Sequence, residues 1–170
     1  MFYTETKRSG SNEKKRPEIT DAEEIRRILS RARVLHLGLN DDEGPYVVPM
    51  HYGFLFENGK LTLYTHCARE GHKLSLIRRD GRAFVEIDMD ESLVPGEKPC
   101  AWGARYASVM GRGRAAIVED AAEKCRALTL LMRTQTGKDF SITPEMADAV
   151  TVLRIDVETY TAKARRQTGR

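Results

Sequence analysis

The sequence predicts a mainly β protein in which about six antiparallel strands close into a small barrel with peripheral α-helices. Three observations lead to this prediction. Segments of alternating apolar and polar residues outnumber helical segments, turn residues join most consecutive strands, and a regular strand–helix alternation is absent. Hairpin-linked strands of this kind pair antiparallel.

The first half of the chain is expected to form a helix, three strands and a second helix. Thr20 and Glu23 fit a capping box for a helix that ends near Arg31. Turn residues then separate three strands, which we expect over 35–39, 46–56 and 61–66. The second helix is expected over about 71–79, with the apolar side chains of Leu74 and Ile77 turned inward.

The second half is expected to form two strands, two helices and a closing strand. The strands cover 83–89 and 106–118 and are separated by a loop that contains proline and glycine. Asp120 is the expected N-cap of a longer helix, and Pro144 opens a short one. The closing strand includes the alternating stretch 152–157.

Length and composition indicate one globular domain of 170 residues, with 41% hydrophobic and 31% charged residues. We expect a flexible charged leader over 1–17, a folded domain over 18–163 and a basic tail over 164–170. A net charge of +3 is too small to indicate nucleic-acid binding, and no apolar run reaches membrane-spanning length. Three widely spaced cysteines and a start unlike a secretory signal favour a cytoplasmic protein.

The stretch 61–74 runs from a strand through small and polar residues into a helix, and it is a candidate anion site. Free backbone N–H groups at a helix start, together with the ammonium of Lys73, attract a terminal phosphate. Thr65 adds a hydroxyl donor and Arg69 a second cation. An ordinary strand-to-helix turn with surface charges explains the same residues equally well.

Two other stretches carry weaker signals. Pro49 lies within a strand pattern, which indicates an edge strand or a strand that faces something other than a neighbour, such as a flavin ring. Trp102, the only tryptophan, lies close to Cys100, Arg105 and Tyr106. These side chains suit a planar cofactor, a subunit interface or a core, and the sequence leaves all three open.

The four histidines do not predict a metal site. His36, His51, His66 and His72 lack the helical i, i+4 spacing of a zinc pair, and no carboxylate motif accompanies them. Convergence of His51 and His66 on a haem or a metal is the remaining alternative. The pair Gly111 and Gly113 lies inside a strand with no helix after it, so it indicates a bulge or a close strand approach rather than a dinucleotide site.

These stretches together resemble the pyridoxamine 5'-phosphate oxidase-related FMN-binding split-barrel family, in its nitroimidazole-resistance-like branch. Residues 46–50 (YVVPM) are similar to the branch's "PYVVPL" strand, 63–73 to its "YFHSA…GRK" segment and 106–113 to its "YrSVmgfG" strand. The spacing of Cys100 and Trp102 and the closing residues 159–163 also fit. The resemblance covers about residues 20–163 and implies a six-stranded antiparallel split β-barrel with peripheral helices.

The resemblance also implies that FMN lies between the two subunits of a homodimer. Lys73 would pair with the phosphate, and other cofactor contacts would come from Val48, Pro49, Met50, His51, Thr65, His66, Cys67 and Ala68, with Tyr106, Ser108 and Val109 supplied by the partner chain. The chain departs from the branch at His72, where arginine is common, and at Ala162, where glycine is common.

The first functional hypothesis is an FMN-dependent oxidoreductase that reduces small acceptors such as nitro compounds, with His66 as the candidate proton donor. His66 could equally serve only as a hydrogen-bond partner of the flavin. The alternatives are a non-catalytic flavin- or haem-binding protein and a deazaflavin-dependent reductase.

Overall fold

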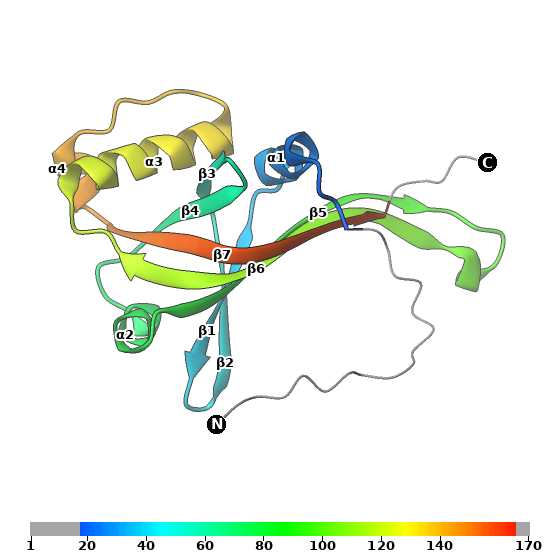
Figure 1. Cartoon of the computed structure of the whole chain (residues 1–170), viewed down its shortest axis with the longest axis horizontal. Helices are drawn as coiled ribbons and strands as arrows, with labels where there is room; N and C mark the ends of the chain where they lie inside the picture. The colour runs from blue at the N-terminus through cyan, green and yellow to red at the C-terminus, as the bar shows by residue number, and fades with distance from the viewer. Residues whose placement is uncertain (1–17, 166–170) are drawn as a thin grey trace.

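The computed structural model describes residues 18–165 and has the predicted fold class, a mainly β antiparallel sheet with helices around it. The expected leader 1–17 and the last residues of the tail lie outside the described part. Figure 1 shows the strands curling around one another, with α1 and α3 on one side and α2 on the other. The elements are α1 (Ala22–Arg31), β1 (Leu35–Asp41), β2 (Gly44–Met50), β3 (Gly53–Glu57), β4 (Lys60–Cys67), α2 (His72–Arg79), β5 (Arg82–Val94), the 3₁₀ turn η1 (Pro99–Ala101), β6 (Gly103–Ile117), α3 (Ala121–Thr136), α4 (Pro144–Asp148) and β7 (Thr151–Arg165).

The sheet has seven strands rather than the predicted six, in the order β2-β1-β5-β6-β7-β4-β3. The difference arises at His51 and Tyr52, where the expected strand 46–56 breaks into β2 and β3. These two strands form the opposite edges of the sheet, yet only two residues join them. The sheet must therefore curl until its edges lie close together, and the chain bends at this point to close the barrel.

Tyr52 holds the bend in place from inside the protein. Its side chain is fully buried, and its hydroxyl donates a hydrogen bond of 2.8 Å to the carbonyl of Leu29 on α1. Burial raises the pKa of Tyr52 far above its usual value, so the phenol stays protonated and remains a donor.

Pro49 lies on an edge strand, as the sequence predicted. β2 is at the edge of the sheet, where a proline that donates no ladder hydrogen bond is tolerated.

Gly53 allows α3 to pack directly on β3. A Cβ atom at this position would lie 2.4 Å from the backbone nitrogen of Leu131, closer than any real contact. We expect Gly53→Ala to lower the free energy of unfolding by about 1–3 kcal/mol, since the helix must move away. Denaturant unfolding measures the loss. Gly38→Ala is the control, because its Cβ would meet Phe84 at an ordinary 3.5 Å; equal stability of the two variants would contradict the packing argument.

The helix ends follow the predicted capping chemistry, with one correction. Asp21, not Thr20, is the N-cap of α1, and its carboxylate accepts a hydrogen bond from the N–H of Glu24. Thr20 and Asp21 are both good capping residues, so the spacing alone did not separate them. Asp120 caps α3 and Pro144 opens α4, as predicted.

Gly113 marks a β-bulge, as the sequence predicted. The pairing of β6 with β7 shifts register between Arg112 and Gly113. A Cβ on Gly113 would lie 2.0 Å from the carbonyl oxygen of Asp156, so only glycine permits this close approach. The bulge lets the two longest strands bend around the barrel.

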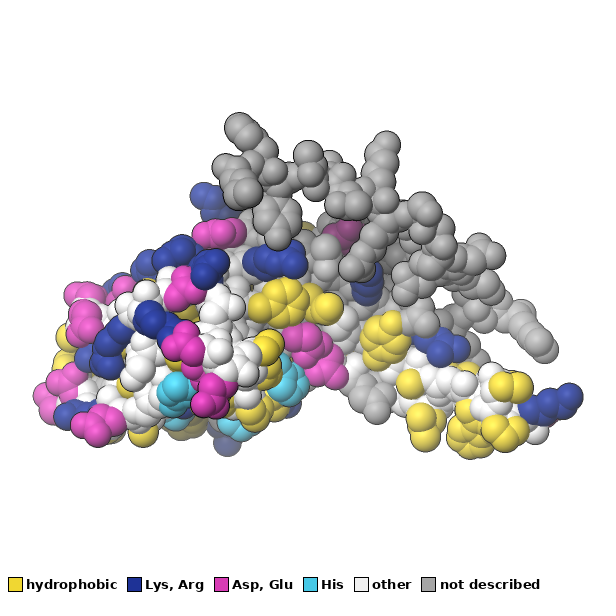
Figure 2. All heavy atoms as spheres, turned by 90° about the horizontal axis from the view of Figure 1, so that it is seen from below, with side chains coloured by type: hydrophobic (Ala, Val, Ile, Leu, Met, Phe, Trp, Pro, Cys, Tyr) yellow, Lys and Arg dark blue, Asp and Glu magenta, His cyan; other side chains and the backbone are white. Residues whose placement is uncertain are grey.

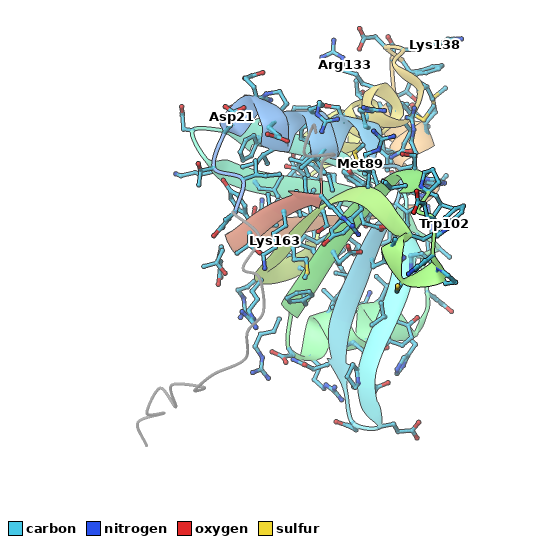
Figure 3. All side chains as sticks on the ribbon, turned by 90° about the vertical axis from the view of Figure 1, so that its right-hand side faces the viewer. Asp21, Met89, Trp102, Arg133, Lys138 and Lys163 are labelled. Atoms are coloured by element: carbon cyan, nitrogen blue, oxygen red, sulfur yellow. The ribbon has the colours of Figure 1, made fainter. Side chains whose placement is uncertain are left out.

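Strands β5 and β6 extend beyond the barrel as an arm, which we define as residues 90–105. The sequence predicted a loop here, whereas the two strands stay paired from Arg82 and Arg114 out to Val94 and Gly103. Figure 1 shows the arm projecting from the body, and Figure 2 shows hydrophobic side chains gathered at its end. Leu93 and Trp102 keep 66% and 52% of their surface exposed, so they are not core residues of a single chain. In Figure 3 Trp102 lies at the edge of the molecule.

The main core fills the barrel with aliphatic side chains from α1, α2 and nearly every strand. A smaller cluster of Tyr64, Val118, Ala127 and Val152 lies between α3 and the sheet. None of the helices in the described part of the chain is both long and apolar enough to span a membrane.

Candidate functional site

The turn between β4 and α2 brings together the donors expected of an anion site. Gly71 is the N-cap of α2 and has no side chain to satisfy the first N–H groups of the helix. Its φ of 150° favours glycine, and a Cβ there would meet nothing within 4 Å. Exposed N–H groups at a helix start and a nearby lysine suit a phosphate.

Lys73 lies beside this turn. Burial raises the pKa of the Cys67 thiol, and the positive charge of Lys73 acts against that rise, so the ammonium is close to Cys67. Lys73 is half-buried and forms no ion pair with another described residue. It is therefore free to pair with an anion. Arg69 differs, because its guanidinium donates to the carbonyl of Asp148 at the end of α4.

Thr65 is the only polar residue of the described chain that is classed as buried. Its hydroxyl lies in the interior and has no hydrogen-bond partner among the described residues. A buried hydroxyl without a partner is costly. Burial means that Thr65 supplies no donor at the protein surface.

His66 and His51 lie close together where the barrel closes. β3 and β4 pair Gly53 with Tyr64, and continuing that register past the end of β3 sets His51 opposite His66. Burial lowers the pKa of His66, and the positive charge of His51 lowers it further. The Nδ1 atom of His51 lies 3.0 Å from the carbonyl oxygen of Arg33. The imidazole of His66 forms no hydrogen bond with another described residue and is exposed, so it can contact a ligand.

His72, where the branch commonly has arginine, faces away from the turn. Its Nε2 atom lies 2.6 Å from the carboxylate of Asp41, and its ring meets Tyr46 edge-on. This hydrogen bond is the largest cause of the lowered pKa of Asp41. His72 thus ties α2 to the hairpin of β1 and β2. Sequence reasoning missed Asp41 because it precedes His72 by 31 residues.

The remaining candidate residues occupy two further places. Val48, Pro49 and Met50 end β2, with Met50 buried and Pro49 exposed. Ala68 is exposed in the turn beside Cys67. Val109 points into the core of its own chain, whereas Ser108 lies on the outer face of β6 beside Asp88.

The β6 residues do not meet the phosphate turn within one chain. Thr65 pairs with Leu153 of β7, which pairs with Ile117 at the far end of β6. Val109 lies eight residues from Ile117 along β6, a separation on the order of 25 Å. Tyr106 and Ser108 lie farther still. A single chain therefore carries two separated halves of the expected site.

The barrel fold and the turn between β4 and α2 together define a split-barrel protein of a flavin-binding class. The chain belongs to the pyridoxamine 5'-phosphate oxidase family, whose model matches residues 21–164. A comparison with curated proteins found no match.

Solved structures place the chain near the nitroimidazole-resistance branch of this family. A protein of Bacteroides thetaiotaomicron, provisionally assigned as a 5-nitroimidazole antibiotic resistance protein, is 34% identical with a TM-score of 0.73. The match covers 88% of this chain and 87% of that one. Two other solved structures are less similar in sequence and show only that the fold is shared. The flavocytochrome Anf3 of Azotobacter vinelandii is 19% identical with a TM-score of 0.68, and the match covers 88% of this chain and 69% of that one. The FAD- and haem-binding protein of Mycobacterium smegmatis is 17% identical with a TM-score of 0.70, and the match covers 88% of this chain and 73% of that one.

Proposed function

We propose that the protein binds FMN between two copies of the chain and acts as an oxidoreductase on small acceptors such as nitro compounds. The observation that supports this most is the turn from β4 to α2. An uncapped helix start at Gly71 and an unpaired Lys73 offer both N–H donors and a positive charge to a phosphate. FMN ends in such a phosphate.

The residues around the turn fit the rest of a flavin. The isoalloxazine ring supplies the redox chemistry when it is bound. Pro49, Met50 and His51 would lie along the ring. Cys67 and Ala68 would follow the ribityl chain, with Thr65 buried behind them. His66, exposed beside His51, would hold or deliver a proton. Exclusion of water over the ring would come from the second subunit.

The absorption spectrum of the purified protein tests the cofactor. FMN gives paired bands in the blue, haem a sharp Soret band and deazaflavin one band at shorter wavelength. Haem binding is the second candidate, because His51 or His66 could hold a haem iron through its imidazole. A Soret band without flavin bands would favour that candidate. Anaerobic reduction of a nitroaromatic acceptor then tests turnover.

A homodimer is the expected state of the protein in solution. The two halves of the flavin site lie far apart in one chain, and the arm exposes Leu93 and Trp102, which a second chain could cover. Light scattering at micromolar concentration should give twice the mass of 19.2 kDa. A monomer that binds flavin tightly would contradict the shared site. We also propose that the protein is cytoplasmic, since its three cysteines are widely spaced in the sequence.

A further inference from the structure

A second cluster of chemically active side chains lies on the outer face of the sheet, away from the phosphate turn. His36 on β1 pairs directly with Glu86 on β5, and Asp88 follows two residues later on the same face. The Nδ1 atom of His36 lies 3.1 Å from a carboxylate oxygen of Glu86. One ligand atom from each of the three residues lies within 4.8 Å of the other two.

We propose that His36, Glu86 and Asp88 bind a divalent first-row transition metal ion such as Zn²⁺. An imidazole and two carboxylates are a ligand set that these ions accept. Two ligand atoms on a tetrahedral zinc ion are about 3.4 Å apart, given bond lengths near 2.1 Å. The His36–Glu86 distance already approaches this value, and a carboxylate oxygen of Asp88 lies within 4.8 Å of both ligand atoms. Water would occupy the fourth position.

The charges around the cluster favour a cation. Within the described part of the chain, neither Glu86 nor Asp88 forms an ion pair with lysine or arginine. Glu86 and Asp88 carry the same charge two residues apart on one face of β5, and a bound cation would offset their mutual repulsion. Arg112, on the same face, lies over the ring of Phe84 instead.

The sheet supplies the rigidity that a metal site needs. Two ligands lie directly opposite each other in a ladder, and the third is fixed two residues along the same strand, so the backbone sets all three positions. A metal ion bound here would join β1 to β5. It would use none of the residues assigned to the flavin, although Pro49 pairs with His36 and Ser108 with Asp88 in the neighbouring strands. The histidine spacing in the sequence gave no sign of it, because the ligands meet across strands rather than along a helix.

Metal titration of the chelator-treated protein, with its flavin as purified, tests the site. Zn²⁺ calorimetry on wild type should show saturable binding of one ion per chain. Co²⁺ should give visible bands without the intense near-ultraviolet band of thiolate ligation, which excludes the cysteines. His36→Ala and Asp88→Asn should each weaken Zn²⁺ binding by at least about tenfold. At a Zn²⁺ concentration 100 times Kd, Tm of the wild type should rise by about 5–10 °C.

His72→Ala is the matched control. His72 is also an exposed histidine beside a carboxylate, that of Asp41, at 2.6 Å, but it is not part of any cluster of three such ligands in the described chain. The control should bind Zn²⁺ as the wild type does. Absence of saturable binding below about 1 mM, a thiolate band with Co²⁺, unchanged affinity in His36→Ala, or equal loss in His72→Ala would each overturn the proposal. Since the readout is metal binding, failure would leave the flavin proposal standing.

Discussion

Lys73→Ala should weaken FMN binding by about ten- to a hundredfold. A charge-assisted bond between an ammonium and a phosphate contributes about 1.5–3 kcal/mol. The two other side chains of the turn that could carry a positive charge are already engaged. Arg69 is held by the carbonyl of Asp148, and His72, where the branch commonly carries arginine, is held by Asp41. Flavin fluorescence quenching during titration of the flavin-free protein measures the affinity.

Arg69→Ala is the control for this experiment. It removes a positive charge from the same turn but from a side chain that already faces α4. Its effect on FMN affinity should be smaller than that of Lys73→Ala. Equal affinity of Lys73→Ala and wild type would mean that the phosphate lies elsewhere. Larger loss in Arg69→Ala would assign the phosphate contact to the arginine instead.

His66→Ala should keep flavin binding and lower turnover by roughly a hundredfold or more, the usual contribution of a general acid. The assay is anaerobic reduction of a nitroaromatic acceptor with saturating FMN. His66 is exposed on β4 and forms no hydrogen bond with another described residue, so its removal should leave the fold intact. If His66 only binds cofactor, affinity and activity will fall together, and added FMN will restore turnover. Full activity in the flavin-saturated variant would remove His66 from the mechanism.

The pH dependence of the wild type gives an independent test of the same role. Burial and the charge of His51 lower the pKa of His66 below its usual 6.5, so the imidazole is mainly neutral at pH 7. A proton donor is active in its charged form. Turnover should therefore rise as the pH falls through a value below 6.5, and this rise should be missing in His66→Ala. His51→Ala removes the neighbouring charge and should shift the rise toward higher pH.

The local chemistry of the sequence determined the secondary structure of most of the chain. Capping residues such as Asp120, the proline at 144 and the alternating apolar residues of 152–157 act within a few residues of one another. The glycine pair at 111 and 113 predicted a bulge for the same local reason. The family resemblance, carried by short motifs, predicted the split barrel and a flavin cofactor.

The tertiary structure decided what depends on contacts between distant residues. The strand 46–56 breaks at Tyr52 because the barrel has to close and the phenol reaches Leu29. The arm stays paired because β5 and β6 continue their antiparallel pairing beyond a register shift between Asp90 and Ser92, which no single segment reveals. His72 meets Asp41 only when α2 packs against the hairpin of β1 and β2. His36 meets Glu86 and Asp88 only when β1 pairs with β5, because the partners of a strand in a sheet can come from any distance along the chain.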